Sequence, residues 1–361
     1  MSQWQLIRLK FAKHKLAVWS VWVLVIVYGI ALFAEVVAPQ TARGSNLDFQ
    51  YCPPQLVRFS FSEGLYTHAL ERNVDPVTLR RTYTDTGENV VPLGLFVSGE
   101  PYELWGLIPM DTHLLGIDRS DPRGEAPWAS FHPLGADEYG RDVFSRIVYG
   151  ARVSLSVGLI GIAITFVLGM SIGGVSGYVG GRTDNFIQRG IEVINSFPQL
   201  PLWIALGAIM PGDWSPLRVY FAITIVLAVL NWTGLARVVR GKILSLREED
   251  YAVAARLLGA SHARVLGRHL LPGFASHVIV ALSLSVPIMI LGETSLSFLG
   301  LGLRPPVVSW GVLLQACMDV QAVRYYPWLL TPVLFIIVTV LSFNFVGDGL
   351  RDAADPYAAE G

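Results

Sequence analysis

The sequence predicts an all-α membrane protein with six transmembrane helices and one polar insertion. Hydrophobic residues make up 52% of its 361 residues and charged residues only 15%, whereas about a quarter of an ordinary soluble protein is charged. The apolar residues gather in runs of about 20, the length that a helix needs to cross a bilayer. Because unpaired backbone groups cannot be left in lipid, we expect these runs to be helical.

Six apolar runs are long enough to serve as spans: residues 16–38, 153–178, 190–210, 219–235, 274–298 and 327–346. The third is the least regular, because Glu192 lies near its start and Pro198 and Pro201 interrupt it. The first follows several basic residues, as a secretory signal core would. It exceeds the roughly 7–15 apolar residues of such a core, and no clean cleavage site follows, so we expect a retained helix. Either interpretation exports the segment that comes next.

The positive charges that flank the spans predict the orientation of the chain. They form three clusters, and all three fall on one side of the membrane if both termini are cytoplasmic. The formal net charge of −1 at pH 7 leaves no excess of positive charge for binding nucleic acid. The clusters consist of Arg8, Lys10, Lys13 and Lys15, then of Arg182 and Arg189, and then of Arg237, Arg240, Lys242, Arg247, Arg256, Arg264 and Arg268.

This orientation divides the chain into four parts: residues 1–38 with the cytoplasmic N-terminus and first span, a periplasmic insertion at 39–131, a five-helix core at 132–350, and a cytoplasmic tail at 351–361. Residues 89–109, "NVVPLGLFVSGEPYELWGLIP", contain β-branched and aromatic residues between Gly and Pro, as short strands do. The insertion is longer than ordinary connecting loops. Two interpretations fit, an ordered elaboration that contacts an external partner and a poorly ordered insertion without a role of its own.

A basic stretch, residues 251–272 or "YAVAARLLGASHARVLGRHLLP", lies in the long loop 237–272 between the fourth and fifth spans. In a helix, Ala252, Ala255 and Gly259 share one face, and Leu257 and Leu258 turn away from it. Small residues allow another surface to approach closely. Gly259 can divide the stretch into two short helices, and Pro272 ends it. The pattern predicts a docking platform, and a basic loop that only fixes topology is the alternative.

Four stretches together resemble one family. Residues 248–272, "EEDYAVAARLLGASHARVLGRHLLP", resemble the segment of ABC-importer permeases in which an Ala-Ala pair, a Gly and a terminal Leu-Pro form the coupling helix that sits in a groove of the ATPase subunit. The other three, "HPLGADEYGRDVFSRIVYGARVSLSVG", "LGETSLSFLGLGLRPPVVSWG" and "FNFVGDGLRDAADP", are similar to the second permease subunit of dipeptide, oligopeptide and nickel importers. Two positions depart from the pattern, since Val253 replaces a Glu and His269 a frequent Ile.

The resemblance covers roughly residues 131 to 361 and the first span, and it implies a type I ABC importer permease fold in a bacterial inner membrane. It implies a sister permease, two ATP-binding subunits that hold ATP and Mg, and a periplasmic solute-binding protein, beside membrane lipid. The cargo would be short peptides or related small solutes, although the long insertion leaves the substrate open. The residues expected to couple to the ATPase are Asp250, Tyr251, Ala254, Ala255, Arg256, Gly259, Ala260, Ser261, His269 and Pro272.

Polar residues inside spans are expensive and are functional candidates by default. Glu192, Asn231 and Glu293 are therefore candidates for the substrate pathway, although Glu192 can instead pair with Arg189 and Glu293 can serve in hydrogen bonding between helices. The chain has no phosphate-binding loop, because Gly241–Lys242 is followed by Ile243 and lacks the earlier Gly. It also lacks the residue spacing of a metal site. We expect ATP to bind elsewhere and no catalytic residue here.

Residues 169–173, "GMSIG", match the G-x-S-x-G pattern of serine hydrolases, but Ser171 falls within the second span. Gly169, Gly173 and Gly177 recur at every fourth position, which favours close packing of helices. An intramembrane serine hydrolase and a secondary transporter are the alternative functions. Cys52 and Cys317 are expected to be ordinary thiols, with a disulfide as the alternative.

Overall fold

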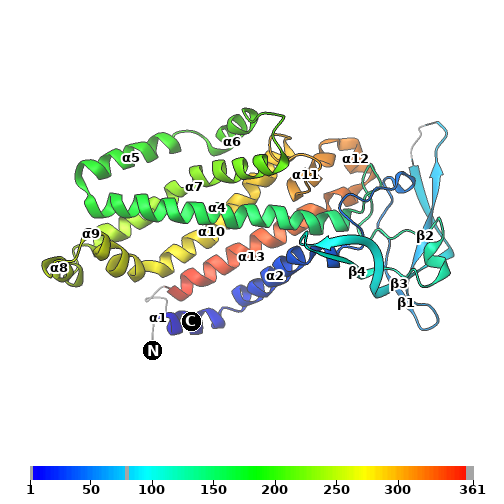
Figure 1. The fold of residues 1–361 in the computed structure, drawn as a ribbon, viewed down its shortest axis with the longest axis horizontal. Helices are drawn as coiled ribbons and strands as arrows, with labels where there is room; N and C mark the ends of the chain where they lie inside the picture. The colour runs from blue at the N-terminus through cyan, green and yellow to red at the C-terminus, as the bar shows by residue number, and fades with distance from the viewer. Residues whose placement is uncertain (1–2, 78–80, 355–361) are drawn as a thin grey trace. The chain divides into compact units, whose positions relative to one another are not determined.

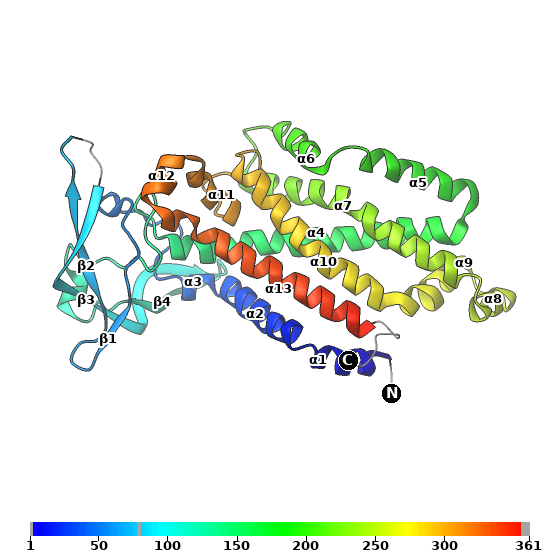
Figure 2. The same cartoon turned by 180° about the vertical axis from the view of Figure 1, so that it is seen from behind.

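The computed structural model describes residues 3–77 and 81–354 (Figure 1; Figure 2). The last seven residues of the predicted tail, 355–361, lie outside the described residues. The chain forms two compact units, residues 1–25, 156–296 and 338–361 in the first, and residues 26–155 and 297–337 in the second. Several long helices run through both units.

Five helical stretches in the described part of the chain are long and apolar enough to cross a membrane: Lys15–Leu32, Val143–Val179, Pro216–Leu246, His262–Phe298 and Pro327–Ala354. They confirm five of the six predicted spans. The third predicted span, 190–210, is not one helix. It is divided between α5 (Gly181–Asn195), which is polar on one face, and the short apolar α6 (Gln199–Ala208). Pro198 lies at the break, where a helix would need the backbone N–H that proline lacks.

The described residues of the first unit form helices joined by short turns. It contains α1 (Gln3–Lys13), the start of α2 (Lys15–Leu32), most of α4 (Val143–Val179), α5, α6, α7 (Pro216–Leu246), α8 (Asp250–Leu257), α9 (His262–Arg264), a π-helical turn (Val265–Leu270), a 3₁₀ turn (Leu271–Phe274), most of α10 (Ala275–Phe298) and the end of α13 (Thr331–Ala354). Because α7 continues to Leu246, residues 237–246 of the predicted loop are helical.

Glycines bring α4 and α7 into close contact (Figure 1). A Cβ atom at Gly169 would lie 2.7 Å from the Leu235 side chain, and one at Gly177 would lie 2.8 Å from the Arg240 carbonyl oxygen. At Gly173 it would overlap the Ala236 carbonyl. This confirms the predicted packing face. Ser171 lies on another, exposed side of the same continuous helix and not in the strand–turn–helix setting of a hydrolase nucleophile.

The second unit contains the insertion, which is an ordered four-stranded antiparallel sheet in the order β1-β2-β3-β4. Its strands are β1 (Arg58–Ser60), β2 (Gly64–Val74), β3 (Arg81–Leu104) and β4 (Ile108–Ile117). The expectation of strands is confirmed, although β3 is far longer than a short strand. Register shifts after His68 in β2 and after Ser98 in β3 interrupt the ladder. The unit also holds α3 (Ala34–Val37), α11 (Trp310–Leu314), α12 (Val320–Tyr325) and short 3₁₀ turns.

Two polar contacts fix the segment that joins the first span to the insertion. Arg152 of α4 donates to both carboxylate oxygens of Glu35 at 2.6 Å, and to the carbonyls of Ala31 and Leu32 at the end of α2. Burial would raise the pKa of Glu35, but the hydrogen bonds and charge of Arg152 outweigh it and lower that pKa. His113 of β4 is fully buried, and its two ring nitrogens lie 2.6 and 3.0 Å from the carbonyl oxygens of Ala38 and Glu100.

The two cysteines are free thiols. Burial raises the pKa of Cys52 to about 12, and that of Cys317 to about 11. The thiolate is the reactive form, so both side chains are expected to react slowly at neutral pH.

Replacing Gly173 by Ala should destabilise the first unit, because the added Cβ atom has no space beside the Ala236 backbone. Overpacking of this kind costs about 1–3 kcal/mol or more. The measurement is the thermal midpoint of the purified chain in detergent. Gly174→Ala is the matched control, since a Cβ atom there makes only ordinary contact with Leu266, at 3.4 Å. Equal midpoints for the two variants would contradict the packing described above.

Candidate functional site

The basic segment between α7 and α10 folds as two short helices that meet at Gly259. The first, α8, begins at Asp250 after the extended residue Glu249, and acidic groups there suit the positive end of a helix. It ends at Leu257, and Gly259 follows with φ of +82°, a conformation that favours glycine. The hydroxyl of Ser261 caps α9 by accepting from the N–H of Arg264 at 3.4 Å. The predicted division at Gly259 is confirmed.

The structure reverses the predicted orientation of α8. Ala252 is fully buried, and Ala255 packs on the same apolar cluster, which includes Val265 and Leu270 from the turns after Gly259. Leu257 and Leu258 are instead 83% and 88% exposed. The small-residue face therefore packs against the chain itself, and the two leucines form the outward surface.

Most of the predicted coupling residues lie on accessible positions of this segment. Asp250, Tyr251, Ala254, Arg256, Gly259, Ser261, His269 and Pro272 are exposed. Ala255 and Ala260 are half-buried against the cluster beneath α8. Val253, at the position where the family pattern has Glu, is also half-buried.

Polar contacts tie α8 and α9 to the ends of α4 and α7. Arg247, which follows α7, donates to the carbonyls of Gly177 and Tyr178 at 3.1 and 3.3 Å. Arg256 of α8 donates to the carbonyl of Arg247 at 3.0 Å. The hydroxyl of Tyr178 lies 3.0 Å from Nδ1 of His262 in α9. The segment is thus held at several points rather than by a single hinge.

An ion pair with a buried carboxylate joins α5 to α7, about two helical turns before Arg247. Arg240 donates to the two carboxylate oxygens of Asp184 at 2.5 and 2.6 Å, and the hydroxyl of Ser176 in α4 donates to the same carboxylate at 2.5 Å. The hydrogen bond from Arg240 is the main cause that lowers the pKa of Asp184. Sequence reasoning used Arg240 only as a topology signal. An arginine within an apolar helix was the signal for a buried partner.

The three candidate pathway residues occupy different environments. Glu192 lies on the exposed side of α5 and pairs with Arg189 at 2.8 Å. Asn231 of α7 donates to the Leu227 carbonyl at 2.8 Å and lies 3.9 Å from the sulfur of Met289 in α10. Glu293 of α10 is fully buried. The structure therefore brings Asn231 next to the helix that carries Glu293 and places Glu192 elsewhere on α5.

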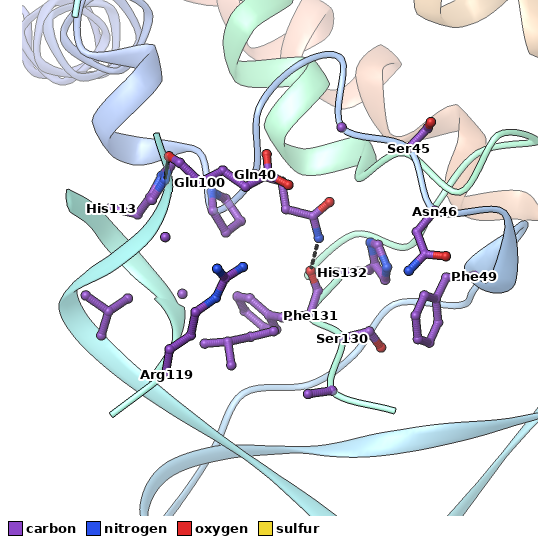
Figure 3. Close-up of a pocket in the computed structure, with 17 residues that line it drawn as sticks. Gln40, Ser45, Asn46, Phe49, Glu100, His113, Arg119, Ser130, Phe131 and His132 are labelled. Atoms are coloured by element: carbon purple, nitrogen blue, oxygen red, sulfur yellow. Dashed lines mark hydrogen bonds between the residues drawn. The ribbon is translucent and has the colours of Figure 1, made fainter. Parts of the chain in front are cut away.

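A polar cavity of about 290 Å³ lies in the second unit, beside the sheet (Figure 3). The guanidinium of Arg119 points into it, and Gln40 donates to the Phe131 carbonyl at its wall, at 2.9 Å. Within the described residues, the Ser130 hydroxyl and Nδ1 of His132 are buried without a hydrogen-bond partner. Every lining residue lies outside the membrane-spanning helices, so this cavity is not part of a path through them.

Residues 166–359 match the model of a family described as the inner membrane component of binding-protein-dependent transport systems. Residues 2–54 match that of the N-terminal transmembrane domain of oligopeptide transport permease C. The chain belongs to this transport family. It is a multi-pass inner-membrane protein and a permease of an ABC importer, so its role is transport and not catalysis. The sheet of the insertion lies outside both matches.

Individual relatives support this membership. The dipeptide transport system permease protein DppC of Bacillus subtilis is 41% identical over 64% of this chain and 70% of its own length. The oligopeptide transport system permease protein OppC of the same organism is 37% identical, over 68% of this chain and 76% of its own length. The glutathione transport system permease protein GsiD of Pectobacterium atrosepticum is 38% identical, over 65% and 76%.

Asp184→Asn should lower the thermal midpoint, because it leaves Arg240 without its counter-ion. Breaking a buried pair costs up to about 3–5 kcal/mol, and less where one partner keeps some solvent contact, as Arg240 does. Since the native pKa of Asp184 is lowered, its contribution is complete above the ordinary Asp pKa and is lost as the pH falls through the lowered value. The difference in thermal midpoint between the parent chain and the Asp184→Asn variant should therefore shrink in acid.

The control for this measurement is Glu192→Gln, which removes an ion pair whose side chains are 82% and 54% exposed. Exposed pairs contribute little, so this variant should match the parent chain at every pH. A loss of stability that is the same for both variants would contradict a structural role specific to Asp184.

Proposed function

We propose that this permease carries short peptides, or chemically related small solutes, into the cytoplasm. The support is the consistent naming of its relatives, which are permeases of dipeptide, oligopeptide and glutathione transport systems. Glu293 and Asn231 are the polar side chains that we assign to the substrate pathway. Both belong to long apolar helices, where polar groups are expensive and are retained for function or for helix contacts.

The proposed complex contains a sister permease, two ATP-binding subunits and a periplasmic solute-binding protein. Both termini and the α8–α9 segment face the cytoplasm, since this places all three basic clusters there. ATP and Mg bind to the partner subunits, because this chain has no phosphate-binding loop. The binding protein delivers the solute on the opposite side of the membrane.

The ATPase contact that we propose is the outward surface of α8, centred on Leu257 and Leu258. The single observation that carries it is their exposure of 83% and 88% beside a well-packed apolar cluster. Burying a leucine side chain gains about 1.5–3 kcal/mol, so a groove that covers both would bind them favourably. Tyr251 and Ala254 extend the same exposed surface along the helix.

Movement of α8 would reach the spans through the contacts on its inner side. Ala252 is packed in the cluster that includes Val239 and Ile243 of α7. Arg256 contacts Arg247, which in turn holds the end of α4. An ATPase that binds α8 differently in its open and closed states would therefore bias the arrangement of α4 and α7.

The double substitution Leu257→Asp and Leu258→Asp should abolish association with the ATPase, because charged groups cannot enter an apolar groove without a large desolvation cost. The measurement is co-purification of ATPase activity with the tagged permease from native membranes. The control is Leu47→Asp with Leu56→Asp, a pair that is 59% and 71% exposed in the insertion. ATPase retained by the first variant at the level of the control would refute this contact.

Substitutions at Gly259 should affect transport because they change the backbone conformation of this turn. A Cβ atom at this position meets no atom within 4 Å, but the φ of +82° disfavours any branched or bulky side chain. We expect Gly259→Leu to lose ATP-driven uptake in proteoliposomes and Gly259→Asn to keep most of it, because asparagine tolerates the left-handed region. Solute affinity of the binding protein should be unchanged. Uptake that survives equally in both variants would show that the turn is not needed.

A further inference from the structure

The turn between β3 and β4 presents apolar side chains to the outside of the molecule. We define the β3–β4 tip as residues 105–108, "WGLI". Trp105, Leu107 and Ile108 are 45%, 79% and 48% exposed. The tip carries no charged residue, so nothing within it favours contact with water. A concentration of exposed apolar side chains marks an interaction surface.

The tip is fixed beside the end of the membrane-spanning helix α2. Nε1 of Trp105 donates to the carbonyl oxygen of Leu32, the last residue of that span, at 2.7 Å. The Trp105 ring also lies 5.7 Å from the Phe33 ring. Further along the hairpin, β4 runs beside α3, which follows α2 (Figure 2). These contacts place the tip at the level where the apolar span ends.

The side chains at the end of α2 and directly after it are themselves exposed. Leu32 is 52% and Phe33 43% exposed, so the surface of the tip continues that of the span. A tryptophan at the end of a span is typical of the membrane–water interface, where the apolar ring meets lipid and the N–H needs a polar partner. Trp105 satisfies its N–H with a carbonyl that the end of α2 leaves unpaired in the helix.

The backbone of the tip is held in an unfavourable conformation at Trp105. Its φ is +55°, next to Gly106 with φ of +71°. A bulky residue rarely adopts a positive φ, and glycine or asparagine would fit the turn better. Strain of this kind persists where the surroundings hold it, and here it aims the indole at the end of α2.

We propose that the β3–β4 tip is a lipid anchor, in which Trp105, Leu107 and Ile108 insert into the interfacial region of the bilayer beside α2. The tip inserts into phospholipid and not into a groove of a partner protein. Its exposed apolar surface continues that of α2, at the level where this span meets lipid. The anchor fixes the height of the sheet above the membrane. It does not depend on the substrate or on the ATPase contact.

The turn between β1 and β2 provides an internal contrast. Phe61 in this turn and Phe59 in the preceding strand β1 are also exposed, at 101% and 64%, and their ring centroids lie 5.5 Å apart. No hydrogen bond or ring contact among the described residues joins this pair to a span. We therefore expect Phe61 to lie in water although its exposure is greater.

The test uses the full chain reconstituted in phosphatidylcholine nanodiscs, with a nitroxide label at Leu107→Cys or, in a second variant, Ile108→Cys. Power saturation compares the accessibility of each label to oxygen, which concentrates in lipid, and to a water-soluble nickel chelate. Phe61→Cys is the aqueous control. The native thiols are poor competitors for the label, since burial raises the pKa of Cys52 to about 12 and of Cys317 to about 11.

Labels at positions 107 and 108 should show high oxygen and several-fold lower nickel accessibility than the label at 61. Nickel accessibility equal to that at 61 would overturn the proposal, because the tip would then lie in water. Low accessibility to both reagents would overturn it as well, because a protein surface and not lipid would then cover the tip.

Discussion

The close approach of α4 and α7 at three glycines is the contact on which the rest of the first unit depends. With the backbones this near, Arg240 of α7 reaches Asp184 on α5, and Arg247 reaches the last carbonyls of α4. Any side chain at Gly173 or Gly177 would push the two helices apart and break both polar contacts. The position of α8, which rests on Arg247 and on the cluster beneath it, follows from the same contact.

Features that depend on local pattern could be predicted from the sequence. The long apolar runs became spans, the glycines at every fourth position became a packing face, and Gly259 became the turn between two short helices. The prediction of the third span was wrong because Pro198 lies at a break between two helices, and the helix before it is polar on one face. Apolar content alone could not show that the run would form two pieces.

The orientation of α8 could not be predicted, because a helix of eight residues takes its inner face from whatever packs beneath it. Here the partners are Val265, Leu270 and Phe274, which come after the turn and fold back under Ala252. The Asp184–Arg240 pair was missed for a similar reason, since the two residues lie far apart in sequence and on different helices. The two short helices that carry the candidate coupling residues could be predicted, but which of these residues are exposed depends on tertiary packing.

We infer that α8 moves as one body with the end of α4, so that a force on Leu257 and Leu258 reaches the spans. The most direct measurement is the distance between spin labels at the exposed positions Ala254→Cys and Val175→Cys, in the assembled transporter with and without ATP. If α8 and α4 move together, the two labels should give one narrow distance distribution that ATP leaves unchanged. A distribution that shifts or broadens when ATP binds would contradict it, because α8 would then move independently of the helix that it is meant to drive.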